Sequence, residues 1–159
     1  MKKRLLLFLA VGLLSGLAVG AQSWAADEHI LIAPDAITWG PMPPGLPTGA
    51  QAAILSGDPG KNGPFVIRIK TPAGYTVPPH HHSKDEDVTI ISGKAGLAMG
   101  ETLAKGTGKA LSAGGFVHMP ADMAHFAWTE QDSIIQISGI GPFDITYVNP
   151  KDDPRTNAK

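Results

Sequence analysis

The sequence predicts a single all-β domain, built as a small antiparallel β-barrel or jelly roll. Its apolar segments are short, and most are rich in β-branched or aromatic residues. Glycine and proline, with 19 and 14 residues, recur along the whole chain and separate these segments by turns. No segment of helical length carries apolar residues at helical spacing. Many short strands separated by turn residues are typical of β-sandwiches and β-barrels.

Eight segments have the composition expected of strands. Each is short and is bounded by Gly, Pro, Asp or Asn, which favour turns. The segments are residues 52–55, 65–70, 75–77, 88–91, 97–99, 116–119, 133–137 and 145–148. A further strand is expected to begin at His125, after the turn residues Pro120-Ala121-Asp122.

The first 25 residues have the three parts of a secretory signal peptide. Met1-Lys2-Lys3-Arg4 is positively charged, residues 5–18 lack charge, and Ser23-Trp24-Ala25 places small residues where signal peptidase reads them. The uncharged run is shorter than the roughly 20 apolar residues of a membrane-spanning helix. Cleavage after Ala25 is therefore favoured over retention as a membrane anchor. We expect a bacterial protein exported to the periplasm or out of the cell.

The rest of the chain divides into an extended lead-in at residues 26–50, a barrel domain at residues 51–149 and a polar tail at residues 150–159. We expect the tail to fray. Removing residues 1–25 shifts the formal net charge from −1 to −4. A weakly acidic domain without a basic stripe is a poor candidate for binding nucleic acid or an anionic membrane. Because the sequence has no cysteine, a metal site must use histidine and carboxylate ligands.

Histidines cluster in the predicted barrel. His80 and His82 are two residues apart, so on a strand both side chains leave the same face and His81 leaves the other. Glu86 follows shortly afterwards, and His125 stands far downstream at the start of another predicted strand. If the barrel brings these strands together, three imidazoles and one carboxylate converge. This donor set suits one divalent ion of Fe, Mn, Ni, Cu or Zn and leaves coordination positions open for water, substrate or dioxygen.

The spacing of these residues resembles the two sequence motifs of the cupin superfamily. The fixed positions of the first motif are all matched, by Gly74, His80, His82, Glu86 and Gly93. The second motif is matched at Gly114, Pro120 and His125. It departs at Asp122 and Thr129, where the family often has glycine and asparagine, and neither position is a metal ligand in the family pattern. Aspartate tolerates a left-handed turn better than most residues, so the turn at Asp122 can be kept.

The resemblance implies the double-stranded β-helix fold of the cupins, with a metal ion held by His80, His82, Glu86 and His125. Cupins with this ligand set include dioxygenases, decarboxylases, isomerases and proteins without catalysis, so the fold does not decide the reaction. The leading hypothesis is a dioxygenase-like oxidoreductase acting on a small organic molecule. Glu86 would then be the catalytic residue, a ligand that also accepts a substrate proton.

Two other functions remain open at this point. A metal-dependent decarboxylase or isomerase would need a further acid or base, for which His118, Asp122 and Tyr147 are candidates. A non-enzymatic cupin would bind or sense a small ligand. Cupin relatives often form homodimers by packing one sheet or exchanging an N-terminal strand, a role open to residues 30–47.

The remaining candidates have simpler interpretations. His81 is expected to be exposed, and His118, in an apolar strand, to be buried and hydrogen-bonded rather than a cavity residue. Asp85 and Asp87 are expected at turns or on the surface. Core or cavity-wall positions are expected for the aromatic side chains of Trp39, Phe126 and Trp128.

Overall fold

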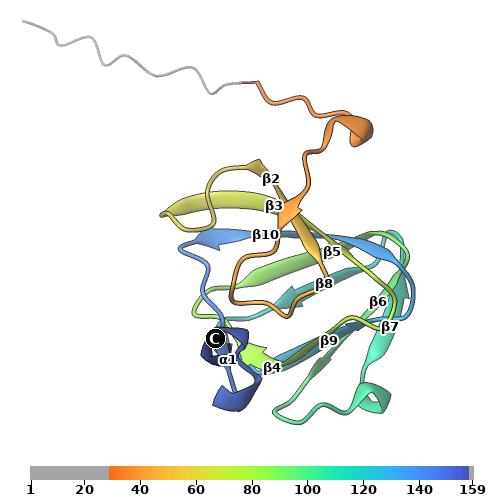
Figure 1. The fold of residues 1–159 in the computed structure, drawn as a ribbon, viewed down its shortest axis with the longest axis vertical. Helices are drawn as coiled ribbons and strands as arrows, with labels where there is room; N and C mark the ends of the chain where they lie inside the picture. The colour runs from red at the N-terminus through yellow and green to blue at the C-terminus, as the bar shows by residue number, and fades with distance from the viewer. Residues whose placement is uncertain (1–28, 158–159) are drawn as a thin grey trace, which may run out of the picture.

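The computed structural model describes residues 29–157 and consists almost entirely of antiparallel strands in two facing sheets (Figure 1). The all-β, jelly-roll prediction is therefore confirmed. The predicted signal peptide, residues 1–25, lies outside the described residues. Within residues 29–157, no helix is long and apolar enough to cross a membrane.

The larger sheet has six strands in the order β1-β2-β3-β10-β5-β8. Their bounds are Gly40–Pro41 (β1), Gln51–Ser56 (β2), Gly63–Thr71 (β3), Ser133–Gly141 (β10), Glu86–Ser92 (β5) and Phe116–Met119 (β8). The smaller sheet has five strands in the order β11-β4-β9-β6-β7. Their bounds are Thr146–Tyr147 (β11), Thr76–His81 (β4), His125–Thr129 (β9), Lys94–Met99 (β6) and Lys109–Ser112 (β7).

Alternation along the strands explains how the sheets face each other. In β3, the side chains of Phe65, Ile67 and Ile69 are buried, and Val66 and Arg68 between them are only partly buried. Successive side chains of a strand point to opposite faces, so the apolar set turns inward. In β5, Val88 and Ile90 follow the same pattern. These inward faces form the main core between the sheets.

The eight predicted strand segments all overlap strands of the structure, and β9 begins at His125 as predicted. Two strands are not anticipated by the sequence. β1 has only two residues, and Leu111 is the one large apolar residue of β7, so neither carries an alternating pattern.

Short helical turns lie at η1 (Pro34–Ala36), η2 (Lys105–Thr107), η3 (Pro150–Asp152) and α1 (Pro154–Asn157). The expectation that the tail from residue 150 frays is not met over residues 150–157. Arg155 anchors this segment, because its Nη2 donates to the carbonyl oxygen of Ile145 at 2.9 Å and to Asp153 at 2.7 Å.

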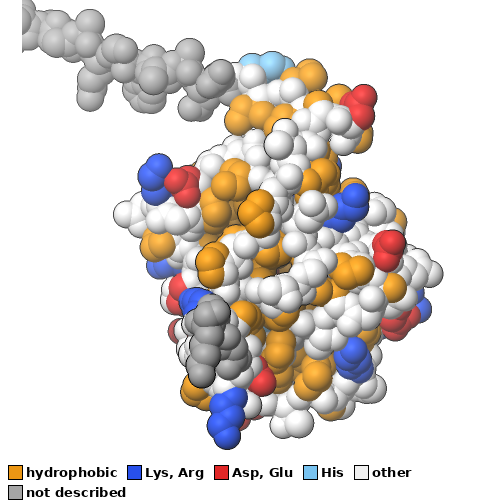
Figure 2. Space-filling model, in the orientation of Figure 1, with side chains coloured by type: hydrophobic (Ala, Val, Ile, Leu, Met, Phe, Trp, Pro, Cys, Tyr) orange, Lys and Arg blue, Asp and Glu red, His pale blue; other side chains and the backbone are white. Residues whose placement is uncertain are grey.

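Trp39 does not occupy the core position expected for it. Its ring is half-buried on the lead-in, with the Nζ of Lys70 5.9 Å from the ring centroid. Phe126 and Trp128 are buried as expected, in a second, smaller apolar cluster with Ala98. The space-filling view shows apolar side chains gathered over the middle of one face, with charged side chains mainly around its rim (Figure 2).

Candidate metal centre and cavity

Strand ends place the four predicted ligands. His80 lies near the end of β4, His82 follows that strand, and His125 begins β9. His80 and His125 are direct partners in the β4–β9 pairing, which brings their rings together. Glu86 begins β5 in the opposite sheet. The donor atoms therefore meet between the two sheets.

The three imidazoles converge closely. One ring nitrogen from each of His80, His82 and His125 lies within 4.8 Å of the other two. The Oε2 atom of Glu86 lies 3.4 Å from Nε2 of His125 and 3.7 Å from Nε2 of His82. All four side chains are buried, with exposed fractions of 2 to 5%. The cluster thus presents three nitrogen donors with a carboxylate oxygen beside two of them.

The opposite nitrogen of each ring is held by the backbone. Nδ1 of His80 lies 2.7 Å from the carbonyl oxygen of Pro78, and Nδ1 of His125 lies 2.9 Å from that of Met123. Nδ1 of His82 contacts the carbonyl oxygen of Asp144. Because a carbonyl oxygen only accepts hydrogen bonds, each Nδ1 carries the proton and each Nε2 keeps its lone pair.

This arrangement fits a divalent metal ion. Nε2 of His82 is buried and has no hydrogen-bond partner, which is costly unless another group binds it. Metal-bound histidines commonly donate their other ring N–H to a carbonyl or carboxylate, as all three rings do here. Three imidazole nitrogens and one carboxylate suit the first-row transition metals, with coordination positions left over.

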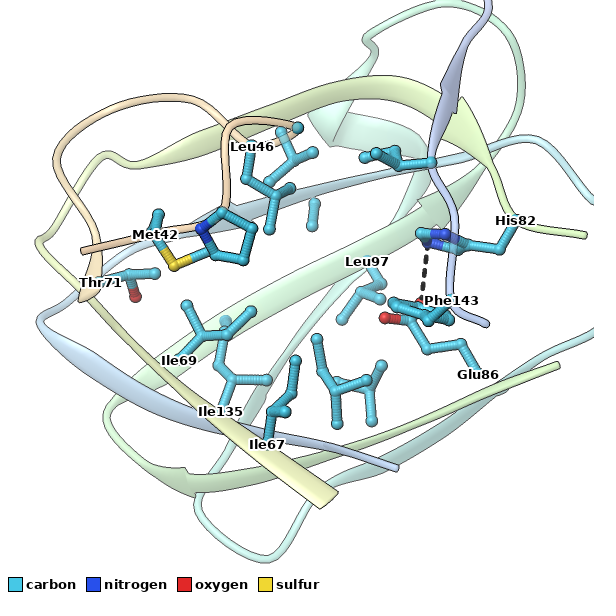
Figure 3. Close-up of a pocket in the computed structure, with 18 of the residues that line it drawn as sticks. Met42, Leu46, Ile67, Ile69, Thr71, His82, Glu86, Leu97, Ile135 and Phe143 are labelled. Carbon is cyan, nitrogen blue, oxygen red and sulfur yellow. Dashed lines mark ion pairs between the residues drawn. The ribbon is translucent and has the colours of Figure 1, made fainter. Parts of the chain in front are cut away.

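Electrostatics keep the rings in the metal-binding form. Burial, together with the neighbouring imidazole of His125, lowers the pKa of His80 to about 3. Burial also lowers the pKa of His82, although Glu86 opposes the shift. Both rings are therefore neutral near pH 7, so the 3.7 Å contact between Nε2 of His82 and Oε2 of Glu86 joins a neutral ring to a carboxylate (dashed in Figure 3).

The segment that follows β10 fixes His82 from outside the strands. The ring of Phe143 stacks on the imidazole of His82, with 4.3 Å between centroids and an interplanar angle of 20°. The carboxylate of Asp144 accepts hydrogen bonds from the backbone N–H and hydroxyl of Ser83, at 2.9 and 2.7 Å. Burial alone would raise the pKa of Asp144, but these hydrogen bonds hold it below its ordinary value.

The candidate metal centre opens onto an apolar cavity of about 330 Å³ between the sheets (Figure 3). His82, Glu86 and His125 lie in its wall, whereas His80 does not. Most of the remaining wall is aliphatic or aromatic, including Ile67, Ile69, Val88, Leu97, Ile135 and Phe143. Among residues 29–157, no lysine or arginine lines it. A volume of this size is at the small end of the range for small-molecule sites.

Several predicted candidates lie away from this cavity. His118 is exposed rather than buried, because it pairs with Asp87 on the outward face of β5, and its Nδ1 lies 2.8 Å from that carboxylate. The side chain of Asp122 is 81% exposed, on a left-handed turn with φ of 60°. The hydroxyl of buried Tyr147 donates to the carbonyl oxygen of Gly45 at 2.9 Å.

His81 points away from the cluster, as strand alternation predicts, but it is half-buried rather than exposed, with 35% of its side chain accessible. Asp85 is on the surface, where it accepts a hydrogen bond from the backbone N–H of Ala121 at 2.8 Å. Asp87, on β5, is partly buried beside His118.

The sequence interpretation missed the supporting residues of the site. Four of these residues line the cavity from irregular segments: Met42, Leu46, Phe143 and Asp144. No spacing rule relates such segments to the strands that they contact. The one signal was Pro142, which marks the end of β10 and the start of a turn.

Residues 27–144 match the model of the ChrR cupin-like domain, which covers well over half of the chain. The chain belongs to this cupin family. The resemblance found in its two motifs is thereby confirmed. No curated protein matches the sequence.

Solved cupin structures share its fold. A candidate acetylacetone dioxygenase from Methylibium petroleiphilum PM1 has 23% sequence identity and a TM-score of 0.63, over 82% of this chain and 88% of that one. The acetylacetone dioxygenase from Acinetobacter johnsonii has 18% identity and a TM-score of 0.61, over 80% and 82%. The polyketide cyclase RemF from Streptomyces resistomycificus has 15% identity and a TM-score of 0.65, over 80% and 90%. At these identities the likeness shows the cupin fold.

Proposed function

We propose that this cupin is an exported mononuclear-metal enzyme, an oxidoreductase of the dioxygenase type that acts on a small, apolar organic molecule. The observation that carries the proposal is the position of the donor set. The neutral His82 and the carboxylate of Glu86 lie in the wall of an apolar cavity, beside His80 and His125. The leader at residues 1–25 supports export.

Because the two acetylacetone dioxygenases share the fold of this chain, 1,3-diketones are the first substrates to test. When bound, a redox-active divalent ion supplies electron transfer between an organic molecule and dioxygen, which no side chain of the cavity supplies. Such a reaction consumes one dioxygen and places both oxygen atoms in the products, so it needs no external reductant. His80, His82, Glu86 and His125 would hold the ion.

The chain itself contributes a base and a dry site. Glu86 is a buried carboxylate at the cavity wall, where its oxygen can accept a proton from an acidic carbon or hydroxyl of the substrate. The apolar walls exclude water, which strengthens electrostatic interactions within the cavity. The backbone carbonyls at each Nδ1 fix the imidazole rings in place.

The candidates for a further acid or base do not support the decarboxylase or isomerase alternative. His118 and Asp122 are exposed, and neither they nor Tyr147 line the cavity. The remaining acidic side chain in the wall, Asp144, is held by Ser83.

Oxygen consumption tests the proposal. The protein, loaded separately with Fe(II), Mn(II), Ni(II) and Cu(II), is mixed with acetylacetone or catechol in an oxygen electrode. We expect uptake of one dioxygen per substrate consumed with at least one of the metals, and its loss on chelation. Binding of these compounds without oxygen uptake in any metal form would contradict the enzyme and favour a small-ligand binding protein.

A further inference from the structure

One wall of the cavity is a loop rather than a strand. Residues 42–49, here named the cover segment, connect β1 to β2. The two ends are held together, because Pro41 pairs with Gln51 and Gly40 with Ala52. Apart from this pairing, it makes one backbone–backbone hydrogen bond among the described residues, from Leu46 N–H to the carbonyl oxygen of Pro43 at 3.2 Å. It is thus a compact loop with a paired base, like an Ω-loop.

The cover segment closes the cavity on the side away from the metal centre. Met42 and Leu46 line the cavity and pack against the core between the sheets. The close-up shows both side chains over the cavity, at a distance from His82 and Glu86 (Figure 3). A Cβ atom on Gly45 would lie 2.9 Å from Cγ2 of Ile145, so the loop backbone presses directly against the barrel.

Two tyrosine hydroxyls fasten the cover segment. The hydroxyl of Tyr75 donates to the carbonyl oxygen of Pro47 at 2.6 Å, and that of Tyr147 donates to the carbonyl oxygen of Gly45 at 2.9 Å. Both rings belong to the core, so these donors are fixed to the barrel while their acceptors belong to the loop. Burial raises the pKa of Tyr75 to about 12, which keeps its hydroxyl protonated.

The other walls of the cavity are less able to open. Most of their residues lie on strands joined by ladders of backbone hydrogen bonds, such as the nine-residue pairing of β3 with β10. The irregular wall at residues 143–145 is held by hydrogen bonds from Phe143 N–H to Pro59, from Ser83 to Asp144 and from Arg155 to Ile145. Opening there would break many hydrogen bonds, whereas lifting the cover segment breaks the two tyrosine bonds and separates Met42 and Leu46 from the core. Motions of functional loops use such regions of low local stability.

We propose, building on the function proposed above, that the cover segment is the gate of the cavity, fastened by Tyr75 and Tyr147, and that it admits uncharged apolar molecules. The charge preference follows from the walls. Glu86 and Asp144 are acidic, and among the described residues no lysine or arginine lines the cavity, so in the metal-free protein no cationic side chain compensates an organic anion that enters.

Cysteine labelling tests the gate directly, because the chain has no cysteine of its own. Val88→Cys places one thiol in the cavity wall, at a side chain that is only 3% exposed. Ile69→Cys provides a second position if the first variant does not fold. Each variant is labelled with uncharged methyl methanethiosulfonate and with its anionic 2-sulfonatoethyl analogue. Every rate is divided by the rate for the same variant unfolded in denaturant.

When closing is faster than labelling, the rate reports the population of the open form. We expect strong protection of the thiol in the parent variant. Tyr75→Phe or Tyr147→Phe should each raise labelling by the uncharged reagent about fivefold, and the pair by about 25-fold. The anionic reagent should stay slower throughout. Thr107→Val, which removes a hydroxyl bond to the carbonyl oxygen of Ala104 in the η2 turn, where neither residue lines the cavity, should leave the rates unchanged.

Tyrosine variants that label at the parental rate would overturn the gate, as would a parent thiol as reactive as in the unfolded chain. Equal protection against both reagents would overturn the charge preference. The assay uses neither metal nor turnover, so failure of the proposed oxidation chemistry leaves its outcome unaffected.

Discussion

At the scale of single residues, the candidate metal centre depends on which nitrogen of each imidazole carries the proton. Three backbone carbonyls occupy the Nδ1 atoms of His80, His82 and His125, and the Nε2 atoms are left to converge. Glu86 adds the one carboxylate of the cluster from the opposite sheet. Glu86 is thus the one predicted ligand that comes from the larger sheet.

Glu86→Gln keeps the size of the side chain and removes its charge. We expect metal affinity to fall by at least about 10- to 100-fold, the range seen when supporting groups of metal sites are changed. Turnover should fall further, because the general base is lost. Isothermal titration calorimetry with Mn(II) or Ni(II) measures the metal affinity. Glu101→Gln, at an exposed position, is the matched control. If Glu86→Ala kept both metal content and turnover, the role assigned to Glu86 would be wrong.

At the scale of elements, the pairing of β6 with β9 supports the strand that begins with His125. Gly96 lies opposite Trp128 in this pairing, and a Cβ atom at Gly96 would collide with the indole ring. Trp128 in turn lines the cavity. Glycine is therefore needed at position 96 for space rather than for an unusual backbone angle.

Gly96→Ala should destabilise the protein by about 1 to 3 kcal/mol through overpacking against Trp128. Urea unfolding followed by circular dichroism measures the change in the free energy of unfolding. Gly106→Ala, in the η2 turn with open space around the new methyl group, is the control and should change stability little. Equal stabilities of the two variants would contradict the packing described for β6 and β9.

The strands and the candidate ligands could be predicted from the sequence, whereas the residues that support the site could not. The alternation of β3 and β5 fixes their inward faces, and the spacing of His80, His82 and Glu86 predicts their convergence. The outward facing of His118 was not predictable, because it depends on the register of β8 with β5, in which His118 pairs with Asp87. The cover segment and Phe143 were missed because tertiary contacts, not local patterns, determine the path of irregular chain.

At the scale of the whole molecule, metal binding should be linked to folding, because the four donor groups come together only in the packed barrel. A free metal concentration 100 times the dissociation constant adds about 2.7 kcal/mol to the free energy of unfolding. For a domain of this size, we expect Tm to rise by roughly 10 °C. Thermal unfolding with and without added ion measures the shift, which EDTA should reverse. A metal-independent Tm would contradict the linkage.

The lead-in also bears on the assembly of the molecule. Ile30, Leu31 and Ile32 are exposed by 54, 81 and 41%, and Ile54 on β2 by 59%. Exposed apolar side chains of this kind are common at protein interfaces. Formation of a homodimer through the lead-in stays a prediction, which sedimentation of the wild type beside Leu31→Asp would check. A monomeric wild type would contradict it.

The central claim is that His80, His82, His125 and Glu86 hold one metal ion. Elemental analysis of the mature protein, purified beside a His80→Ala/His125→Ala double variant and an exposed-histidine control, His118→Ala, tests it most directly. We predict one divalent transition-metal ion per chain in the wild type and in His118→Ala, and none in the double variant. Equal metal content in the wild type and the double variant, or no stoichiometric metal in the wild type, would contradict the account.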